Sequence, residues 1–352
     1  MKTFHRHNHF VPQMYLKRWS VDGHKIFGYR TLVSHQNIPL WNTYSIKGVA
    51  FQPHLYTRLS AEGETDEVER WLERDFETPA EEAIKKVVSD QKLSYEDWQR
   101  LARFAAAQSV RTPAKLFQGM ERWHKEMPKI MESTLKKAVT KLEEAKKTGI
   151  PIKTRKNVAS ETFPMRVSTE PIPDTDKSFL KVETIIGRGT WLFGLNRLLT
   201  KTLKVLLKHR WSIMFAAPNF EWFTSDDPVI CLNYYGNGSY DFRGGWGNKG
   251  SEILLPLSPR HMLYTKVGAK NKSRIEVSYE FCTKLQRFIA EHSDRWIFAH
   301  EPFEKIEMLC PRIVDPTAYN TEMEAWNKWH DDQSRAEKQY MKSSEIKRSD
   351  GT

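Results

Sequence analysis

Residues 66–87 read DEVERWLERDFETPAEEAIKKV, and this stretch decides the fold class of its half of the chain. Its apolar side chains recur at intervals of three and four residues, which is the period of an amphipathic α-helix. The residues on this stripe are Val68, Trp71, Leu72, Phe76, Ala80, Ala83, Ile84 and Val87. We therefore predict a helix that buries one face against a core.

The helical pattern continues toward the C-terminus. Ser94 lies three residues before Asp97, which is a variant of the capping box and predicts the start of a second helix. This helix should end before Pro113, and a third run rich in Lys and Glu, 114–148, should end at Gly149. Helices are thus expected over most of 66–148.

A change of pattern follows a fourth predicted helix at 192–209. Short apolar runs separated by turn residues now predict strands, and a strand is also expected at 24–30, after a tight turn. A further helix and strand are expected at 278–292 and 296–299. The strand-like runs are WSIMFAA (211–217), EWFTSD (221–226), PVICLN (228–233), EILLPLS (252–258) and HMLYTKV (261–267).

These elements predict an α+β fold, a mostly antiparallel sheet with a large helical insertion or helical subdomain. We divide the chain into four regions. They are an N-terminal segment that joins the sheet (1–65), a mainly helical region (66–210), a sheet-rich region (211–315) and a helical or frayed tail (316–352).

The composition favours a globular protein with a polyanionic partner. Hydrophobic residues make up 39% of the 352 residues, and the formal net charge is +11. A basic balance favours nucleic acid, nucleotide phosphates or acidic surfaces, although many basic proteins bind none of these. Residues 125–157 hold ten Lys or Arg and four Glu. They form either a solvated helix with a surface loop or an arm that faces phosphates.

The cysteines and the absent motifs narrow the class of protein. Cys231, Cys282 and Cys310 are too far apart for a CxxC zinc site, and their odd number argues against a disulfide framework. The first residues lack the apolar core of a signal peptide, and no run approaches about 18 apolar residues. We therefore expect a cytoplasmic protein without a membrane partner. No P-loop, GxGxxG, HExxH or GxSxG motif occurs.

Five short strings of the sequence stand out together over about residues 9–300. They are His9-Phe-Val-Pro-Gln13 with Tyr15, Leu16 and Trp19; Phe76-Glu77 with Ala83-Ile84; Phe104, Gln108 and Arg111-Thr-Pro113; Trp211 with Phe223-Thr-Ser-Asp-Asp-Pro-Val229; and Pro256-Leu-Ser-Pro259. These strings resemble those of the DUF4238 family of uncharacterised, mainly bacterial proteins. They occur in the family's order, and their combination is fairly specific. One departure is Lys284-Leu-Gln286, where the family usually carries an Asn.

The resemblance implies a fold and a candidate site, without an established activity. We predict that His9, Gln13, Arg111, Ser225 and Asp226 meet in one pocket, because a helix start, a helix end and a strand-end loop are rigid carriers of a site. Arg111 would clamp an anion, Asp226 would act as a base or metal ligand, and His9 as acid, base or ligand. Alternatively, Arg111 forms a buried pair with a Glu, and the loop around Asp226 is a turn that binds its own backbone.

No cofactor follows from these residues, but a divalent metal fits the carboxylates. His5, His7 and His9 alternate, so in an extended chain they would share one face and offer three imidazoles to a metal. The leading functional hypothesis is an enzyme acting on nucleic acid or a nucleotide, such as a nuclease-like toxin or a phage-defence effector. The alternative is a non-catalytic regulatory module that binds nucleic acid or protein.

Overall fold

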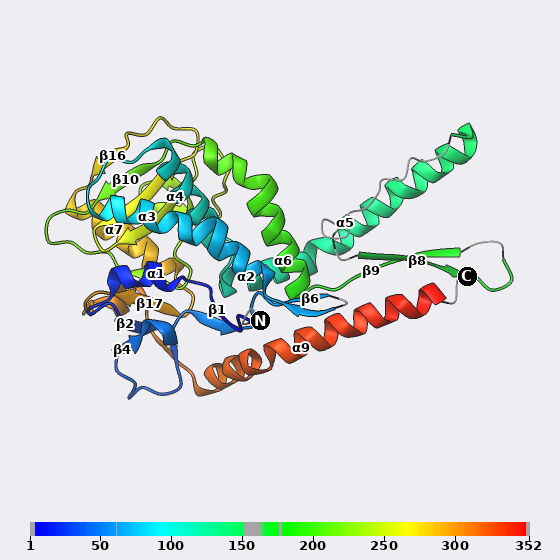
Figure 1. Ribbon diagram of the computed structural model, residues 1–352, viewed down its shortest axis with the longest axis horizontal. Helices are drawn as coiled ribbons and strands as arrows, with labels where there is room; N and C mark the ends of the chain where they lie inside the picture. Colours follow the sequence, from blue (N-terminus) through cyan, green and yellow to red (C-terminus); the bar gives the residue numbers. More distant parts are fainter. Residues whose placement is uncertain (1–3, 61, 151–162, 164, 176–177, 350–352) are drawn as a thin grey trace.

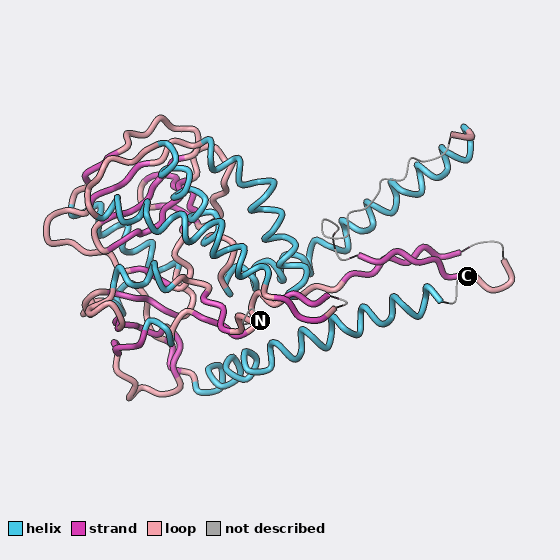
Figure 2. The backbone as a smooth tube through the Cα atoms, viewed as in Figure 1, coloured by secondary structure: helices cyan, strands magenta, loops and turns pink. Residues whose placement is uncertain are grey.

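The computed structural model describes residues 4–60, 62–150, 163, 165–175 and 178–349. A body of sheets and helices carries three long elements that project on one side of it (Figure 1). These elements are the helix α5 (Pro113–Thr148), the hairpin of β8 (Met165–Pro171) and β9 (Ser178–Thr184), and the helix α9 (Pro316–Ser349). The predicted α+β class is confirmed by helices and mainly antiparallel sheets in the same body (Figure 2).

The largest sheet has six strands in the order β13-β12-β14-β15-β10-β16. Neighbouring strands are antiparallel except for β10 and β16. All six lie in the region where strands were expected. Their bounds are β10 Ser212–Phe215, β12 Ile230–Gly236, β13 Ser239–Asp241, β14 Glu252–Ser258, β15 His261–Lys266 and β16 Arg274–Glu276.

The second sheet has four strands in the order β11-β17-β2-β4, and it pairs strands from the N-terminal segment with strands from the sheet-rich region. N-terminal strands β2 (Lys25–Arg30) and β4 (Trp41–Ser45) pair with β17 (Trp296–Ala299), which also pairs with β11 (Thr224–Ser225). Smaller pairs are β1 (His7–His9) with β5 (Phe51–Pro53), β3 (Leu32–Val33) with β18 (Ile313–Val314), and β6 (Arg58–Ser60) with β7 (Gly63–Thr65).

The helix expected at 66–87 forms in three consecutive parts, α2 (Glu67–Leu72), a π-helical turn (Glu73–Glu77) and α3 (Thr78–Val88). Pro79 has no backbone N–H for the usual bond one turn back, which explains why the winding loosens here. α4 (Tyr95–Gln108) begins at Ser94 with the predicted capping box. The Thr112 side chain caps α5, and Gly149, at φ +68°, ends it.

Both faces of the six-stranded sheet are buried, because successive side chains along its strands point to opposite faces. Ile253, Leu255 and Leu263 belong to a core cluster that includes α2, α3 and α4. Leu254 and Met262 belong to a second cluster with α7 (Tyr279–His292). The sheet is therefore the middle layer between helices, and the period of two in its strands places apolar residues on both sides.

Two parts of the chain differ from the prediction that residues 66–210 are mainly helical. The helix expected at 192–209 is α6 (Arg188–Arg197) followed by a π turn (Leu198–Thr202) and a 3₁₀ turn (Leu203–Lys208). The hairpin β8–β9 lies in the same region, and we did not predict it. Among the described residues, no helix is long and apolar enough to cross a membrane.

Candidate functional site

Arg111, predicted to clamp an anion, is fully buried at the end of the α4 segment. Its guanidinium donates to a carboxylate oxygen of Glu77, to the Tyr56 hydroxyl (3.1 Å) and to the backbone carbonyl of His9 (2.7 Å). Glu69 lies 3.9 Å from the same guanidinium. The π turn supplies Glu77, and the segment after β5 supplies Tyr56. These contacts make Arg111 the centre of a buried polar cluster, as in the alternative interpretation of a structural Arg–Glu pair.

Burial sets the proton occupancy of two groups in this cluster. It raises the pKa of Glu69 to about 8, although the charge of Arg111 opposes this rise. Burial, reinforced by the charge of Arg111, lowers the pKa of His9 to about 4. His9 is therefore a neutral imidazole at pH 7, and its Nε2 accepts a hydrogen bond of 2.9 Å from the Gln13 side-chain amide. The His9 side chain thus braces the first turn of α1 (Gln13–Leu16).

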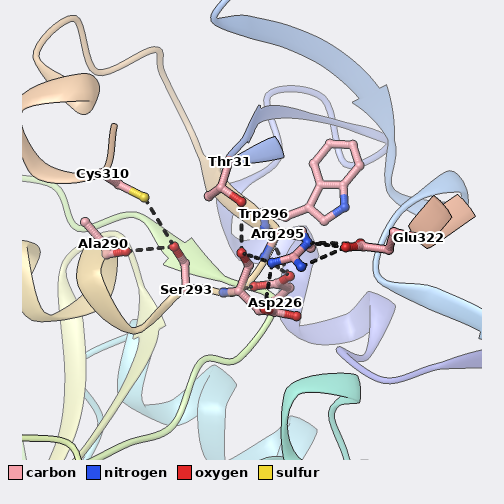
Figure 3. A network of polar contacts seen from close by, with 9 residues as sticks. Thr31, Asp226, Ala290, Ser293, Arg295, Trp296, Cys310 and Glu322 are labelled. Atoms are coloured by element: carbon pink, nitrogen blue, oxygen red, sulfur yellow. Dashed lines mark hydrogen bonds and ion pairs between the residues drawn. The ribbon is translucent and has the colours of Figure 1, made fainter. Parts of the chain in front are cut away.

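Asp226 lies in the loop after β11, and backbone amides surround its carboxylate (Figure 3). Its two oxygens accept hydrogen bonds from the N–H groups of Asp294 (3.0 Å), Arg295 (2.8 Å) and Trp296 (3.1 Å). Burial and the charge of Asp294 raise the pKa of Asp226, whereas the N–H groups of Arg295 and Asp294 oppose the rise by favouring the carboxylate. The carboxylate joins the loop to the start of β17.

The same network continues to α9. The Arg295 side chain donates to both carboxylate oxygens of Glu322, at 2.9 and 2.7 Å from Nε, and to the Asp294 carboxylate at 2.9 Å (Figure 3). Asp226, Arg295 and Glu322 therefore link the loop after β11, the start of β17 and the first turns of α9.

Asp227, the next residue, forms a second connection that we did not predict. Its buried carboxylate accepts from the Thr112 hydroxyl (2.9 Å) and forms an ion pair with Lys115 (2.9 Å). Its backbone carbonyl accepts from His292 at the end of α7 (2.9 Å). The available signal was the pair of charged residues in Asp226-Asp227, but a sequence does not identify partners that lie 115, 112 and 65 positions away.

Two side chains of the motif strings are buried without a polar partner among the described residues. They are Gln108, whose amide oxygen and nitrogen are both unpaired, and Ser225, whose hydroxyl is unpaired. Each such group costs about 1–3 kcal/mol when it is left unsatisfied. In the same region, the side chain of Gln286 accepts a bond of 3.4 Å from the Phe223 N–H.

The five predicted site residues fall into two neighbouring groups in the described structure. His9, Gln13 and Arg111 are joined by hydrogen bonds, whereas Asp226 contacts residues 294–296, next to Ser225 in the loop. The bond between Thr112 and Asp227 connects the groups through the residues adjacent to Arg111 and Asp226. Within the described ranges, no hydrogen bond or ion pair joins Asp226 to His9 or Arg111. A shared catalytic role for the five residues stays a prediction.

A cleft of about 1070 Å³ lies where α5, α9, β5 and the start of β17 meet. Asp226, Asp294, Glu322, Glu121 and Asp331 contribute carboxylates to its lining, whereas Arg30 and Arg295 contribute guanidinium groups. Arg295 is paired with Glu322, and Arg30 stacks on the ring of Trp296, 4.8 Å from its centroid. The wall therefore has more carboxyl groups than guanidinium groups.

Exposed basic residues instead follow the helical segment 197–208. We call Arg197, Lys201, Lys204 and Lys208 the basic ridge, and all four are exposed. Residues 197–210 contain no Asp or Glu. α5 meets the start of this segment, because Trp123 packs so closely on Gly194 that an added Cβ would lie 3.2 Å from the ring. The basic residues of the two helical elements thus extend from a common crossing point.

The predicted metal set at the N-terminus is not among the groups that could hold an ion. His7 and His9 do share a face of β1, but both imidazole rings pack on Phe51. Their centroids lie 5.4 Å (His7) and 5.6 Å (His9) from the centroid of the Phe51 ring. In the described part of the chain, one group of three has ligand atoms close enough for an ion: His54, Glu64 and His330.

Comparison with known proteins gives one match. Residues 7–302 match the model of a family described as "Protein of unknown function (DUF4238)". Searches of curated proteins and of solved structures give no match. The matched span contains the Arg111 cluster, the Asp226 loop and the basic ridge. The chain therefore belongs to the DUF4238 family.

Proposed function

We propose that this protein binds nucleic acid through the basic ridge and the exposed basic residues of α5. The main support is the basic ridge, which presents four exposed cationic side chains on a segment that contains no Asp or Glu. Lys and Arg neutralise backbone phosphates and release counterions, and this gain in free energy does not depend on sequence. Such a protein would be the non-catalytic binding module that the sequence allows as the alternative to an enzyme acting on nucleic acid.

The spacing of the ridge suits a repeating anionic ligand. Its residues follow one another at intervals of four, three and four along the π turn and the 3₁₀ turn, and each side chain is exposed. With a rise of about 1.5–2.0 Å per residue, the 11 steps from Arg197 to Lys208 extend over roughly 16–22 Å, enough to meet several phosphates of one strand. Among the described residues, no carboxylate lies within ion-pair distance of Arg197, Lys204 or Lys208, so these charges are not neutralised internally.

α5 adds a second row of basic residues. Arg122, Lys129 and Lys136 are exposed and seven residues apart, so they share a face of the helix. Lys136 pairs with Glu132 at 2.7 Å, but both side chains are largely exposed, and such pairs contribute little. Lys153, Arg155 and Lys156 of the predicted basic segment 125–157 lie outside the described residues. The described part, from 125 to 148, supports the phosphate-facing interpretation.

Binding is placed ahead of hydrolysis because of what the proposed catalytic groups contact. The guanidinium of Arg111 and the carboxylate of Asp226 are both occupied by internal partners, so neither is free for a substrate. A nuclease-like or phage-defence activity stays a prediction, and so does location in the cytoplasm.

The test is binding of labelled single-stranded and double-stranded oligonucleotides, followed by fluorescence anisotropy over a series of salt concentrations. The ridge variant carries Arg197→Gln, Lys201→Gln, Lys204→Gln and Lys208→Gln. Each lost phosphate contact should reduce the slope of log K against log salt by about 0.9 on duplex DNA, so the slope should fall by up to about 3.6.

A matched control removes the same charge elsewhere. Lys17, Lys25, Lys47 and Lys305 are exposed, and all four are replaced by Gln. This variant should keep most of the wild-type salt slope. A third variant, in which Lys136, Lys137, Lys146 and Lys147 of α5 are replaced by Gln, measures how much of the salt slope comes from α5. The proposal is overturned if the wild type does not bind at low salt, or if the ridge and control variants lose the same slope.

A further inference from the structure

Two histidines and a glutamate from three separate segments converge beside the cleft. His54 follows β5, Glu64 belongs to β7, and His330 belongs to α9. One ligand atom from each lies within 4.8 Å of the other two. His330 Nε2 is 3.2 Å from a Glu64 oxygen, and the two imidazole rings stack with centroids 3.7 Å apart. Since 266 residues separate Glu64 from His330, local sequence does not explain the convergence.

We propose that His54, Glu64 and His330 bind one divalent transition metal ion, with Zn²⁺ as the best fit. Imidazole and carboxylate ligands suit Zn²⁺, whereas Mg²⁺ and Ca²⁺ prefer sites built from oxygen alone. Two tetrahedral ligands, each about 2.0–2.1 Å from Zn²⁺, lie roughly 3.3 Å apart. The separation of 3.2 Å between His330 and Glu64 already matches this requirement.

The third ligand requires a small movement. Around a tetrahedral ion the two ring centroids would be about 5 Å apart, so the stacked rings must separate by roughly 1.3 Å. His54 is partly exposed, and its Nδ1 makes a hydrogen bond of 3.1 Å with the Thr57 hydroxyl. This contact orients the ring, as outer partners of metal-binding histidines do, and leaves Nε2 for the ion.

Arg188 fixes the tautomer of a neutral His330 ring before the ion binds. Its Nη1 donates to His330 Nδ1 at 3.0 Å, so the proton of a neutral ring is on Nε2, facing Glu64. A metal needs the lone pair of Nε2, so the proton must move to Nδ1 and Arg188 must give up this bond. Its Nη2 bonds to Glu337 (2.6 Å) and Ser334 (3.2 Å) would still anchor the guanidinium while Nη1 moves away from Nδ1.

The proposed ion would have an open position toward the cleft. His54 and His330 both line it, and three protein ligands leave the fourth position of a tetrahedral ion for water or an anionic group. This arrangement of ligands is the one found in catalytic rather than structural zinc sites. The inference does not depend on nucleic-acid binding by the ridge.

The test is titration of the metal-free, full-length chain with Co²⁺, followed by visible absorption, and with Zn²⁺, followed by calorimetry. One ion per chain and the intense visible bands of tetrahedral Co²⁺ are expected. Glu64→Gln and His330→Asn should each weaken binding by at least about tenfold. Thermal unfolding without metal shows whether each variant is folded, and Glu64→Gln, on the exposed hairpin, is the milder change.

Other ligands in the chain are controlled separately. A variant with His5→Asn and His7→Asn removes the two exposed N-terminal histidines and should bind Co²⁺ as the wild type does. Ligation by a cysteine would be seen as a strong sulfur-to-cobalt band in the near ultraviolet. The proposal is overturned if the Glu64→Gln protein is folded and keeps wild-type affinity, or if the N-terminal variant alone loses the ion.

Discussion

The guanidinium of Arg111 donates a hydrogen bond of 2.7 Å to the backbone carbonyl of His9, 102 residues earlier in the chain. This bond joins the end of the α4 segment to the strand β1. The same guanidinium pairs with Glu77 in the π turn, so a single side chain joins three segments. Because Arg111 is fully buried, its charge is stable only while these acceptors stay in place.

Replacing Arg111 with Ala should lower the free energy of unfolding by about 3–5 kcal/mol, because it leaves the carboxylate of Glu77 buried without its partner. Arg111→Lys should recover only part of this loss, since an ammonium cannot reproduce the planar set of donors. Urea unfolding followed by circular dichroism measures both. Arg74→Ala, in an exposed pair with Asp75, is the control and should cost less than about 1 kcal/mol. Equal losses for Arg111→Ala and Arg74→Ala would contradict a structural role.

The elements that the sequence predicted well are those with a strong local signal. The three-and-four stripe at 66–87 and the Ser94–Asp97 capping box both describe contacts within a few residues, and both are found in the structure. The end of α5 at Gly149 is a third example, since only the left-handed backbone conformation of that residue is needed.

The candidate site was harder to predict because its partners are distant and partly backbone. The carboxylate of Asp226 is bound by three consecutive N–H groups, and backbone donors leave no mark in the identity of residues 294–296. The convergence of His54 with His330 depends on how α9 packs, which no local period encodes. Arg111 was expected on a helix end and lies instead in the turn between α4 and α5, three residues after Gln108, whereas its buried pairing was one of two interpretations that the sequence allowed.

Asp226→Asn should destabilise the protein by about 1–3 kcal/mol or more, although the two side chains have nearly the same shape. Each carboxylate oxygen accepts a backbone N–H, and an Asn would turn an NH₂ group toward at least one of these donors. Thermal and urea unfolding measure the loss. Asp174→Asn, an exposed change of the same kind, is the control and should stay within about 0.5 kcal/mol. An Asp226→Asn protein as stable as the wild type, but without the biological effect, would instead support a catalytic role.

The stability of the protein should depend on His9 between about pH 4 and 6.5. Burial and the charge of Arg111 lower the pKa of His9 to about 4 in the folded chain, from 6.5 when exposed. Above pH 6.5 the His9 ring is neutral in both the folded and the unfolded chain, so its titration does not change the free energy of unfolding. As the pH falls through this window, the unfolded chain binds a proton that the folded chain does not bind, so the folded state loses stability.

The measurement compares wild type with His9→Gln by urea unfolding at pH 7.5, 6.5, 5.5 and 4.5. The variant loses the packing of the ring on Phe51 and the bond from Gln13 at every pH, which gives a constant offset. Wild type should lose up to about 1.4 kcal/mol more per pH unit within the window, because one pKa unit corresponds to that free energy. The two curves should therefore approach each other as the pH falls. If they stay parallel from pH 7.5 to 4.5, His9 takes up its proton equally in the folded and unfolded chains, and its ring is not the buried brace of α1 that the contacts with Gln13 and Arg111 indicate.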